Sequence, residues 1–226
     1  MQTLLRHLSG WAYTHNSPVL KGRAKRMRAF QDRVKPPEDA NILDLGGSPL
    51  VWKLIPHNYR VTLVNLPGFN DPDAETDPRY RFIDGDACDL RDRFADQSFD
   101  IVFSNSVIEH VGDEPRQAAF ASEVHRLAAS HWIQTPSDRF PLEVHTGVPF
   151  YWKLPDTMRN RLHRSWQKKL PEWYDMIRET RVLSCERMTS LFPDSQCYRE
   201  RLAMMEKSYA FYRPFTGRDA SAKQSV

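Results

Sequence analysis

The sequence predicts a three-layer α/β fold, in which helices cover both faces of a mostly parallel sheet. The chain has 226 residues, of which 40% are hydrophobic and 27% charged, so it can bury one ordinary core. Strand-like and helix-like stretches alternate between residues 41 and 135, which is typical of parallel β-α units. Two further extended stretches near the end, 196–202 and 208–213, predict a hairpin that adds a C-terminal antiparallel strand.

The expected strands are short apolar or β-branched runs that stop at glycine, proline or a polar residue. In order along the chain they cover 41–45, 60–66, 80–84, 98–105 and 131–135. The expected helices carry apolar residues three and four positions apart. They cover 3–11, 19–34, 49–55, 115–129 and 186–192.

The pattern changes outside the alternating region, and this predicts the organisation of the chain. Residues 1–40 form a basic helical segment, and 41–216 form the α/β domain. Within that domain, about 136–185 is rich in proline, aromatic and basic residues, which predicts a helical insertion or lid beside the sheet. Residues 217–226 are expected to be a flexible tail.

The net charge of +3 is unevenly distributed along the chain: residues 1–35 carry +7, 36–150 carry −10 and 151–226 carry +6. We interpret the basic ends as solvated helix faces, and the alternative is an acidic or phosphate-bearing substrate. Aromatic residues do not interleave with the N-terminal basic ones, so we do not expect a nucleic-acid partner.

Several other classes are disfavoured by composition. No apolar stretch approaches the roughly 20 residues of a membrane span, and the N-terminus lacks the apolar region of a signal peptide. The three cysteines, Cys88, Cys185 and Cys197, form neither a disulfide framework nor a metal-binding pair. We therefore expect a cytoplasmic protein without structural zinc.

Polar residues and glycines gather where the expected strands end. In parallel sheets ligands bind beyond the carboxyl ends of the strands, so these residues should share one site. Gly46-Gly47 follows the first strand, and glycine allows close approach of a ligand to the backbone. A nicotinamide-binding site would need the GxGxxG spacing, which Gly46-Gly47-Ser48-Pro49 lacks.

Taken together and in order, the strand ends resemble those of the class I S-adenosylmethionine-dependent methyltransferases. The resemblance covers residues 41–135 and rests on Asp44-x-Gly46, a second strand end at Asn65, Gly85-Asp86-Ala87, and the fourth-strand stretch 99–111 (FDIVFSNSVIEHV). The last is similar to a type 11-like subset in which Glu-His follows the fourth strand, and residues 134–145 (QTPSDRFPLEVH) resemble a bacterial subset in which Gln-Thr-Pro leads to Glu-x-His. The resemblance implies a Rossmann-like fold, S-adenosyl-L-methionine as cofactor and S-adenosyl-L-homocysteine as product.

The resemblance also implies roles for individual residues. Asp86 and the Ala87 backbone would hold the adenine, the second strand end the ribose, and Gly46 with Gly47 the amino-acid end. The full set of expected cofactor-binding residues is Asp44, Gly46, Gly47, Ser48, Asn65, Leu66, Asp86, Ala87, Asn105 and Ser106. This chain departs from the family at Asn65, where an acid is usual, and at Ser48-Pro49, where a further glycine is usual.

The expected catalytic residues are His110, Glu143 and His145. A histidine can take a proton near neutral pH, and Glu143 and His145 would share a face of an extended segment. Two alternatives stay open: these residues hydrogen-bond the lid to the sheet, or they form a metal site of two histidines and a carboxylate. Structural roles are favoured for Asp100 and are equally open for Glu109.

The predicted activity is methyl transfer (class EC 2.1.1) to an O, N or C nucleophile of a small molecule, by in-line displacement and with assistance from a histidine. The alternatives are an RNA or protein methyltransferase, a non-catalytic adenosylmethionine-binding module, and a nucleotide-sugar or dinucleotide enzyme on a related fold. The acceptor and the oligomeric state, for which a dimer is one option, are not encoded in any motif.

Overall fold

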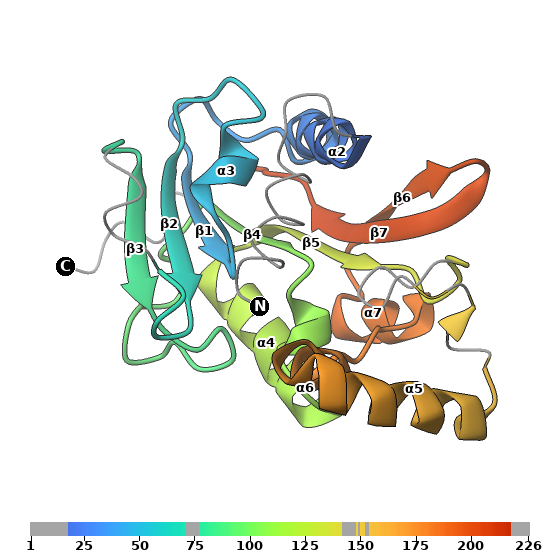
Figure 1. Ribbon diagram of the computed structural model, residues 1–226. Coiled ribbons are helices and arrows are strands. Elements are labelled where there is room, and N and C mark those ends of the chain that lie inside the picture. Colours follow the sequence, from blue (N-terminus) through green and yellow to red (C-terminus); the bar gives the residue numbers. More distant parts are fainter. Residues whose placement is uncertain (1–17, 71–76, 142–147, 149, 152–153, 218–226) are drawn as a thin grey trace.

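A single seven-stranded sheet forms the centre of the protein (Figure 1). The structure is a computed structural model that describes residues 18–70, 77–141, 148, 150–151 and 154–217. The strand order is β3-β2-β1-β4-β5-β7-β6. The strands are β1 Asn41–Leu45, β2 Arg60–Asn65, β3 Tyr80–Asp84, β4 Ile101–Asn105, β5 Ser130–Pro136, β6 Gln196–Leu202 and β7 Met205–Arg213.

All neighbours in the first five strands are parallel, whereas β7 runs antiparallel to both β5 and β6. This confirms the predicted mostly parallel sheet with a C-terminal antiparallel strand. Two strands are shorter than predicted: β2 ends at Asn65 instead of residue 66, and β4 begins at Ile101 instead of residue 98. The backbone N–H of Asp100 donates to the carbonyl of Asn41 (2.9 Å), and its carboxylate accepts from the Asn41 N–H (2.8 Å). Asp100 therefore joins two strand starts and has a structural role.

Helices cover both faces of the sheet, as predicted (Figure 1). Helices α2 (Pro18–Val34) and α3 (Pro49–Trp52) lie on one face, where Phe30 and Trp52 are fully buried. Helices α4 (Glu114–Leu127) and α7 (Cys185–Leu191) lie on the other, with the short 3-10 helix η2 (Ile108–His110) after β4. The helix expected at residues 3–11 lies outside the described residues, as do 218–226 of the expected tail.

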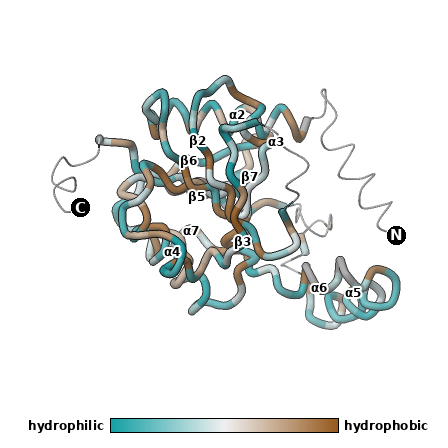
Figure 2. The backbone as a smooth tube through the Cα atoms, turned by 90° about the vertical axis from the view of Figure 1, so that its left-hand side faces the viewer, coloured by the Kyte–Doolittle hydropathy of each residue, from teal (hydrophilic) through white to brown (hydrophobic). Residues whose placement is uncertain are grey.

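The insertion between β5 and α7 contains two helices, α5 (Asp156–Lys169) and α6 (Pro171–Glu179). Helix α5 has no buried residue, and Figure 2 shows both helices projecting to one side of the apolar strands. The predicted helical insertion is confirmed, and its function as a lid stays a prediction.

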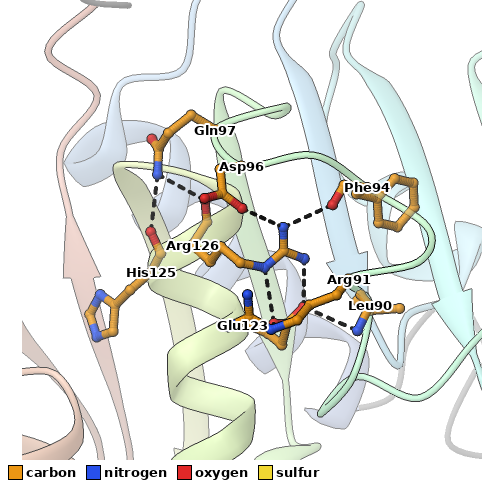
Figure 3. Close-up of polar contacts among 8 residues, drawn as sticks. All are labelled: Leu90, Arg91, Phe94, Asp96, Gln97, Glu123, His125 and Arg126. Atoms are coloured by element: carbon orange, nitrogen blue, oxygen red, sulfur yellow. Dashed lines mark hydrogen bonds and ion pairs between the residues drawn. The ribbon is translucent and has the colours of Figure 1, made fainter.

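The loop between β3 and β4 is fixed to α4 by the side chain of Arg126 (Figure 3). Its guanidinium donates to both carboxylate oxygens of Glu123 (3.0 and 2.7 Å) and to the Phe94 carbonyl (2.8 Å). Glu123 also accepts from the Leu90 N–H at 3.1 Å. Since this loop contains Asp86, the Arg126–Glu123 pair helps to position one edge of the expected ligand site.

Replacing Arg126 with alanine should destabilise the fold, because the Glu123 side chain is only 3% exposed and would lose its main partner. We expect Arg126→Ala to lower the free energy of unfolding by about 3–5 kcal/mol, measured by urea denaturation. Arg91 is the matched control, since it is 67% exposed and 3.9 Å from Glu123. Arg91→Ala should cost less than about 1 kcal/mol, and equal losses in the two variants would contradict the role given to Arg126.

Candidate functional site

The carboxylate of Asp44 is buried beneath the loop that follows β1. Side chains alternate along a strand, so Asp44 points to the same apolar face as Ile42, where Trp52 covers it. Asp44 is 1% exposed, and its Oδ2 accepts a 2.8 Å hydrogen bond from Trp52 Nε1. Its Oδ1 is buried without a hydrogen-bond partner among the described residues. Burial raises the pKa of Asp44 to about 7, although the bond from Trp52 opposes the shift.

The two glycines above this carboxylate are required for different reasons. Gly46 has a φ of 75°, and a Cβ there would also collide with the side chain of Val107. A Cβ on Gly47 would overlap the Asp44 carboxylate itself. Ser48 then caps α3, its Oγ accepting from the Leu50 N–H at 3.4 Å, with proline at the first helical position. Ser48-Pro49, which departs from the family pattern, is therefore the start of a helix.

The side-chain amide of Asn65, at the end of β2, contacts the Gly46-Gly47 loop. Its Nδ2 donates to the Gly47 carbonyl (3.1 Å) and to Asn70 Oδ1 (2.8 Å). A carbonyl oxygen can only accept, so the NH2 group has to face it, and a carboxylate could not replace this contact. The next residue, Leu66, is 53% exposed and offers an apolar surface beside the loop.

Asp86, after β3, is held by Arg116 of α4. Arg116 Nη2 donates to both carboxylate oxygens (2.9 and 2.8 Å), and Cys88 N–H donates to Oδ1 (2.9 Å). Burial alone would raise the pKa of Asp86, but these bonds outweigh it and lower the pKa below its usual value. Ala87 is partly buried and packs on the core. The role of Arg116 could not be predicted from local sequence, because it lies thirty positions from Asp86.

A pocket of about 550 Å³ opens at the carboxyl ends of these strands. Six of the ten predicted cofactor residues line it: Asp44, Gly46, Gly47, Ser48, Asn105 and Ser106. Asn65 is one hydrogen bond away, whereas Leu66, Asp86 and Ala87 do not line it. Ser106 has a φ of 58°, rare for a residue with a side chain, and both its N–H (2.9 Å) and its Oγ (3.0 Å) donate to Gln134.

Arg26 of α2 also lines this pocket, although we did not predict it as a site residue. It is 8% exposed; its Nε donates to Glu200 (2.9 Å), and its Nη1 donates to Asn105 Oδ1 (2.7 Å) and Gln134 Oε1 (3.0 Å). The sequence did carry a signal: Arg26 lies four positions before the buried Phe30, on the apolar face of the helix.

Glu200 of β6 is shared by two cations. Besides Arg26, Lys207 Nζ lies 3.3 Å from its Oε1, and Ser208 Oγ donates to Oε2 at 3.0 Å. Burial would raise the pKa of Glu200, but Arg26 and Lys207 outweigh burial and lower it, so the group is ionised at neutral pH. Two positive charges at the edge of the pocket therefore share one negative charge.

The predicted catalytic residues are only partly within the described chain. His110 ends η2, and its Nδ1 lies 3.2 Å from the Thr180 hydroxyl. Thr180 lines a second cavity, of about 910 Å³, between α4 and the insertion helices. His110 does not line the 550 Å³ pocket. Glu143 and His145 lie outside the described residues.

Glu109, next to His110, is fully buried, and its Oε2 accepts from Thr135 Oγ1 at 3.0 Å. This contact gives Glu109 a structural role between η2 and β5. Within the described part of the chain, no group of three or more His, Cys, Asp or Glu residues could hold a metal ion. The alternative of a metal site through Glu143 and His145 therefore stays a hypothesis.

A methyl group at position 47 should disrupt the loop, because the Asp44 carboxylate occupies the space that it needs. We expect Gly47→Ala to lower the free energy of unfolding by about 1–3 kcal/mol in chemical denaturation. The control is Gly22→Ala in α2, where the nearest atom to a new Cβ is 3.7 Å away. That variant should be neutral or up to about 1 kcal/mol more stable. A harmless Gly47→Ala would show that Asp44 does not pack under the loop.

Comparison with known proteins agrees with this geometry. Residues 52–131 match the family model described as a methyltransferase domain. An uncharacterised protein of Mycobacterium tuberculosis, found in strains CDC 1551 and H37Rv, is 26% identical over 149 residues, which cover 59% of this chain and 48% of that protein. The matched region thus spans about half the length of these curated relatives.

Solved structures share the fold at low identity. A protein from Pyrococcus horikoshii OT3 has a TM-score of 0.57 at 19% identity, covering 90% of this chain and 95% of that one. A 1,6-didemethyltoxoflavin-N1-methyltransferase from Burkholderia thailandensis, solved with 1,6-didemethyltoxoflavin and S-adenosylhomocysteine, has a TM-score of 0.52 at 14% identity, covering 93% and 87%. The chain therefore shares its fold with solved methyltransferases such as the Burkholderia enzyme, and residues 52–131 are similar to the methyltransferase-domain family, in agreement with the resemblance seen in its motifs.

Proposed function

We propose that this protein transfers the methyl group of S-adenosylmethionine to a small molecule. One observation carries the proposal: a buried carboxylate oxygen without a hydrogen-bond partner among the described residues, Asp44 Oδ1, lies under a glycine loop that lines a 550 Å³ pocket. A buried carboxylate oxygen without a partner costs free energy unless a donor or a cation satisfies it. The location at the carboxyl edge of a parallel sheet is where ligands of such folds bind.

The residues at this edge fit the chemical groups of adenosylmethionine. Asp44 would attract its ammonium group, and the Gly46-Gly47 loop would allow its amino-acid end to approach the backbone. Leu66 offers an apolar surface for the adenosine, and Asp86, held by Arg116, offers an acceptor for the adenine amine. When bound, the cofactor supplies an electrophilic methyl group beside a sulfonium cation.

A small-molecule acceptor is favoured over RNA or a protein substrate by the size of the pocket and by two arginines of α2 that contact the rest of the fold. Arg26 is buried in contacts with the protein, and the Arg33 guanidinium lies 4.7 Å from the centre of the Tyr198 ring. These two arginines are therefore engaged within the fold, whereas Lys21, Lys25 and Arg28 of the same helix are exposed. The pocket volume also falls in the range of small-molecule sites, about 300–1,000 Å³.

His110 is the proposed general base for an acceptor hydroxyl or amine. It ends the short helix η2 that comes after β4, and its contact with Thr180 restrains the orientation of the imidazole ring. Glu143 and His145 remain part of the proposal as residues of the insertion. The chain would otherwise act by holding the acceptor and the methyl group aligned at about 3 Å, with water excluded.

The cytoplasm is the proposed location, because Cys88, Cys185 and Cys197 are all unpaired thiols, which suits a reducing compartment. No helix in the described part of the chain is long and apolar enough to cross a membrane.

Asp44→Asn should make the free protein more stable and the complex weaker. The raised pKa of Asp44 means that stability falls as pH rises from about 4 to about 7 and then stays low, because the unfolded carboxyl ionises first. Asparagine keeps an acceptor for Trp52 and removes the charge. We expect Asp44→Asn to gain about 2–4 kcal/mol at pH 8 in denaturation, since one pKa unit equals about 1.4 kcal/mol.

The same variant tests the proposed function by calorimetry with adenosylhomocysteine. Wild type should bind and release protons near pH 6, because the ligand ammonium favours the ionised carboxylate, whereas Asp44→Asn should bind at least about tenfold more weakly. Wild type that binds NAD in preference to adenosylhomocysteine would contradict the proposed function.

Asn65→Asp should reduce affinity for adenosylhomocysteine by about tenfold, although aspartate restores the family pattern. The carboxylate cannot donate to the Gly47 carbonyl or to Asn70 Oδ1, so the loop loses two bonds of roughly 1 kcal/mol each. Asn58→Asp is the control, because its amide donates only to the exposed Glu38. Tighter binding by Asn65→Asp would mean that the ribose contact outweighs the loop contact.

His110→Gln should lower the methyl-transfer rate by about 100-fold or more and leave adenosylhomocysteine affinity unchanged. Turnover is followed as release of adenosylhomocysteine with a panel of small hydroxy and amino compounds. In wild type the rate should rise with pH as one group deprotonates, and the variant should lose this rise. An unchanged rate and pH profile would remove His110 from the mechanism.

A further inference from the structure

The 550 Å³ pocket extends well beyond the glycine loop. Asn105 of β4 pairs in register with Gln134 of β5, and Pro136 of β5 pairs with Ser208 of β7. Gly46, Asn105, Gln134 and Ser208 all line the pocket, so it crosses from β1 over β4 and β5 to β7. With neighbouring strands about 5 Å apart, its far end lies about 14 Å from β1.

The amide groups in the middle of this pocket have a defined orientation. A guanidinium only donates, so the contacts of Arg26 Nη1 require the oxygens of Asn105 and Gln134 to face it. The Gln134 oxygen also accepts from Ser106 Oγ. The NH2 groups of both amides are therefore turned away from Arg26, and both residues line the pocket. Arg26 in this way orients both amides so that their NH2 groups can donate to a ligand in the pocket.

The far end of the pocket also carries excess positive charge. Arg26 and Lys207, which both line it, share the single carboxylate of Glu200. The buried position of Arg26 and Glu200, 8% and 7% exposed, limits screening of this charge by water. A group with several acceptor oxygens and a negative charge would satisfy both the donors and the charge.

We propose that the methyl acceptor carries an oxyanion, a carboxylate or a phosphate, which binds to Lys207 and to the NH2 groups of Asn105 and Gln134. Arg26 is a positioning residue that sets the orientation of both amides. This inference rests on the proposed function, since it assigns the β1 end of the pocket to adenosylmethionine and the β5–β7 end to the acceptor. The acceptor anion would thus be bound beyond the methyl group and orient the nucleophile toward it.

The carboxylate of the cofactor itself is the other possible source of this anion. The amino-acid end of the cofactor is assigned to the Gly46-Gly47 loop, where Asp44 would attract its ammonium group. Lys207 and Ser208 belong to β7, three strands from that loop. An experiment that adds a free oxyanion to the protein already loaded with adenosylhomocysteine separates the two sources.

The test is a titration of inorganic phosphate, and separately of acetate, into the protein with and without saturating adenosylhomocysteine. The side-chain NH2 resonances of Asn105 and Gln134 are followed by NMR. We expect saturable shifts of both in the loaded protein, with a dissociation constant at least tenfold weaker in Lys207→Met. The matched control is Lys25→Met, an exposed lysine next to Arg26 on α2 that lines no part of this pocket, and it should behave as wild type.

Three results would overturn the inference: no saturable shifts in the loaded protein, equal affinity in Lys207→Met and wild type, or displacement of phosphate by adenosylhomocysteine. Displacement would assign the donors to the carboxylate of the cofactor. Failure of adenosylhomocysteine to bind at all would instead defeat the proposed function. In that case saturable phosphate shifts that depend on Lys207 would still establish the oxyanion site, and their absence would exclude it.

Discussion

The hydrogen bond between Asp44 and Trp52, buried beneath Gly47, determines the arrangement of the rest of the site. The carboxylate fills the space above the end of β1, so only glycine fits at position 47. Trp52 reaches Asp44 because it lies at the end of α3, a short helix that starts directly after the loop. Ser48 caps this helix, and Pro49 is its first residue. The Trp52 ring packs edge-on against Phe30 of α2, with centroids 5.8 Å apart, and this contact holds α2 over the sheet.

The same interaction links folding to ligand binding. A carboxylate with one hydrogen bond in an apolar layer is costly to ionise, and the rise in its pKa to about 7 expresses that cost. A cationic ligand next to Asp44 would offset the cost of ionising the carboxylate. The same carboxylate therefore destabilises the free protein and stabilises the complex. Sites that break the ordinary rules of packing in this way are commonly functional.

Local patterns were sufficient to predict most of the fold. The strands at 41–45 and 80–84 match the structure to the residue, because apolar runs bounded by turn residues leave few alternatives. The start of β4 could not be predicted locally, since it depends on Asp100 bonding to Asn41, which is 59 positions away. The prediction of a C-terminal hairpin was correct, although β7 begins at Met205, three residues earlier than expected.

The candidate site was predictable only where its residues follow strands. Arg26 and Arg116 were missed because their partners, Glu200 and Asp86, are 174 and 30 positions distant, and only the fold brings them together. Asn65 and Ser48 depart from the family pattern, and only the structure explains why: Asn65 donates to the Gly47 carbonyl, and Ser48 caps α3. Glu143 and His145 lie outside the described residues, so their predicted roles depend on experiment.

The most direct test of the central claim is a crystal structure of the protein with adenosylhomocysteine. We expect the ligand to lie along the Gly46-Gly47 loop, with its ammonium group bonded to Asp44 and its adenine beside Asp86. A ligand bound instead in the 910 Å³ cavity between α4 and the insertion helices, with no contact to Asp44 Oδ1, would contradict this assignment.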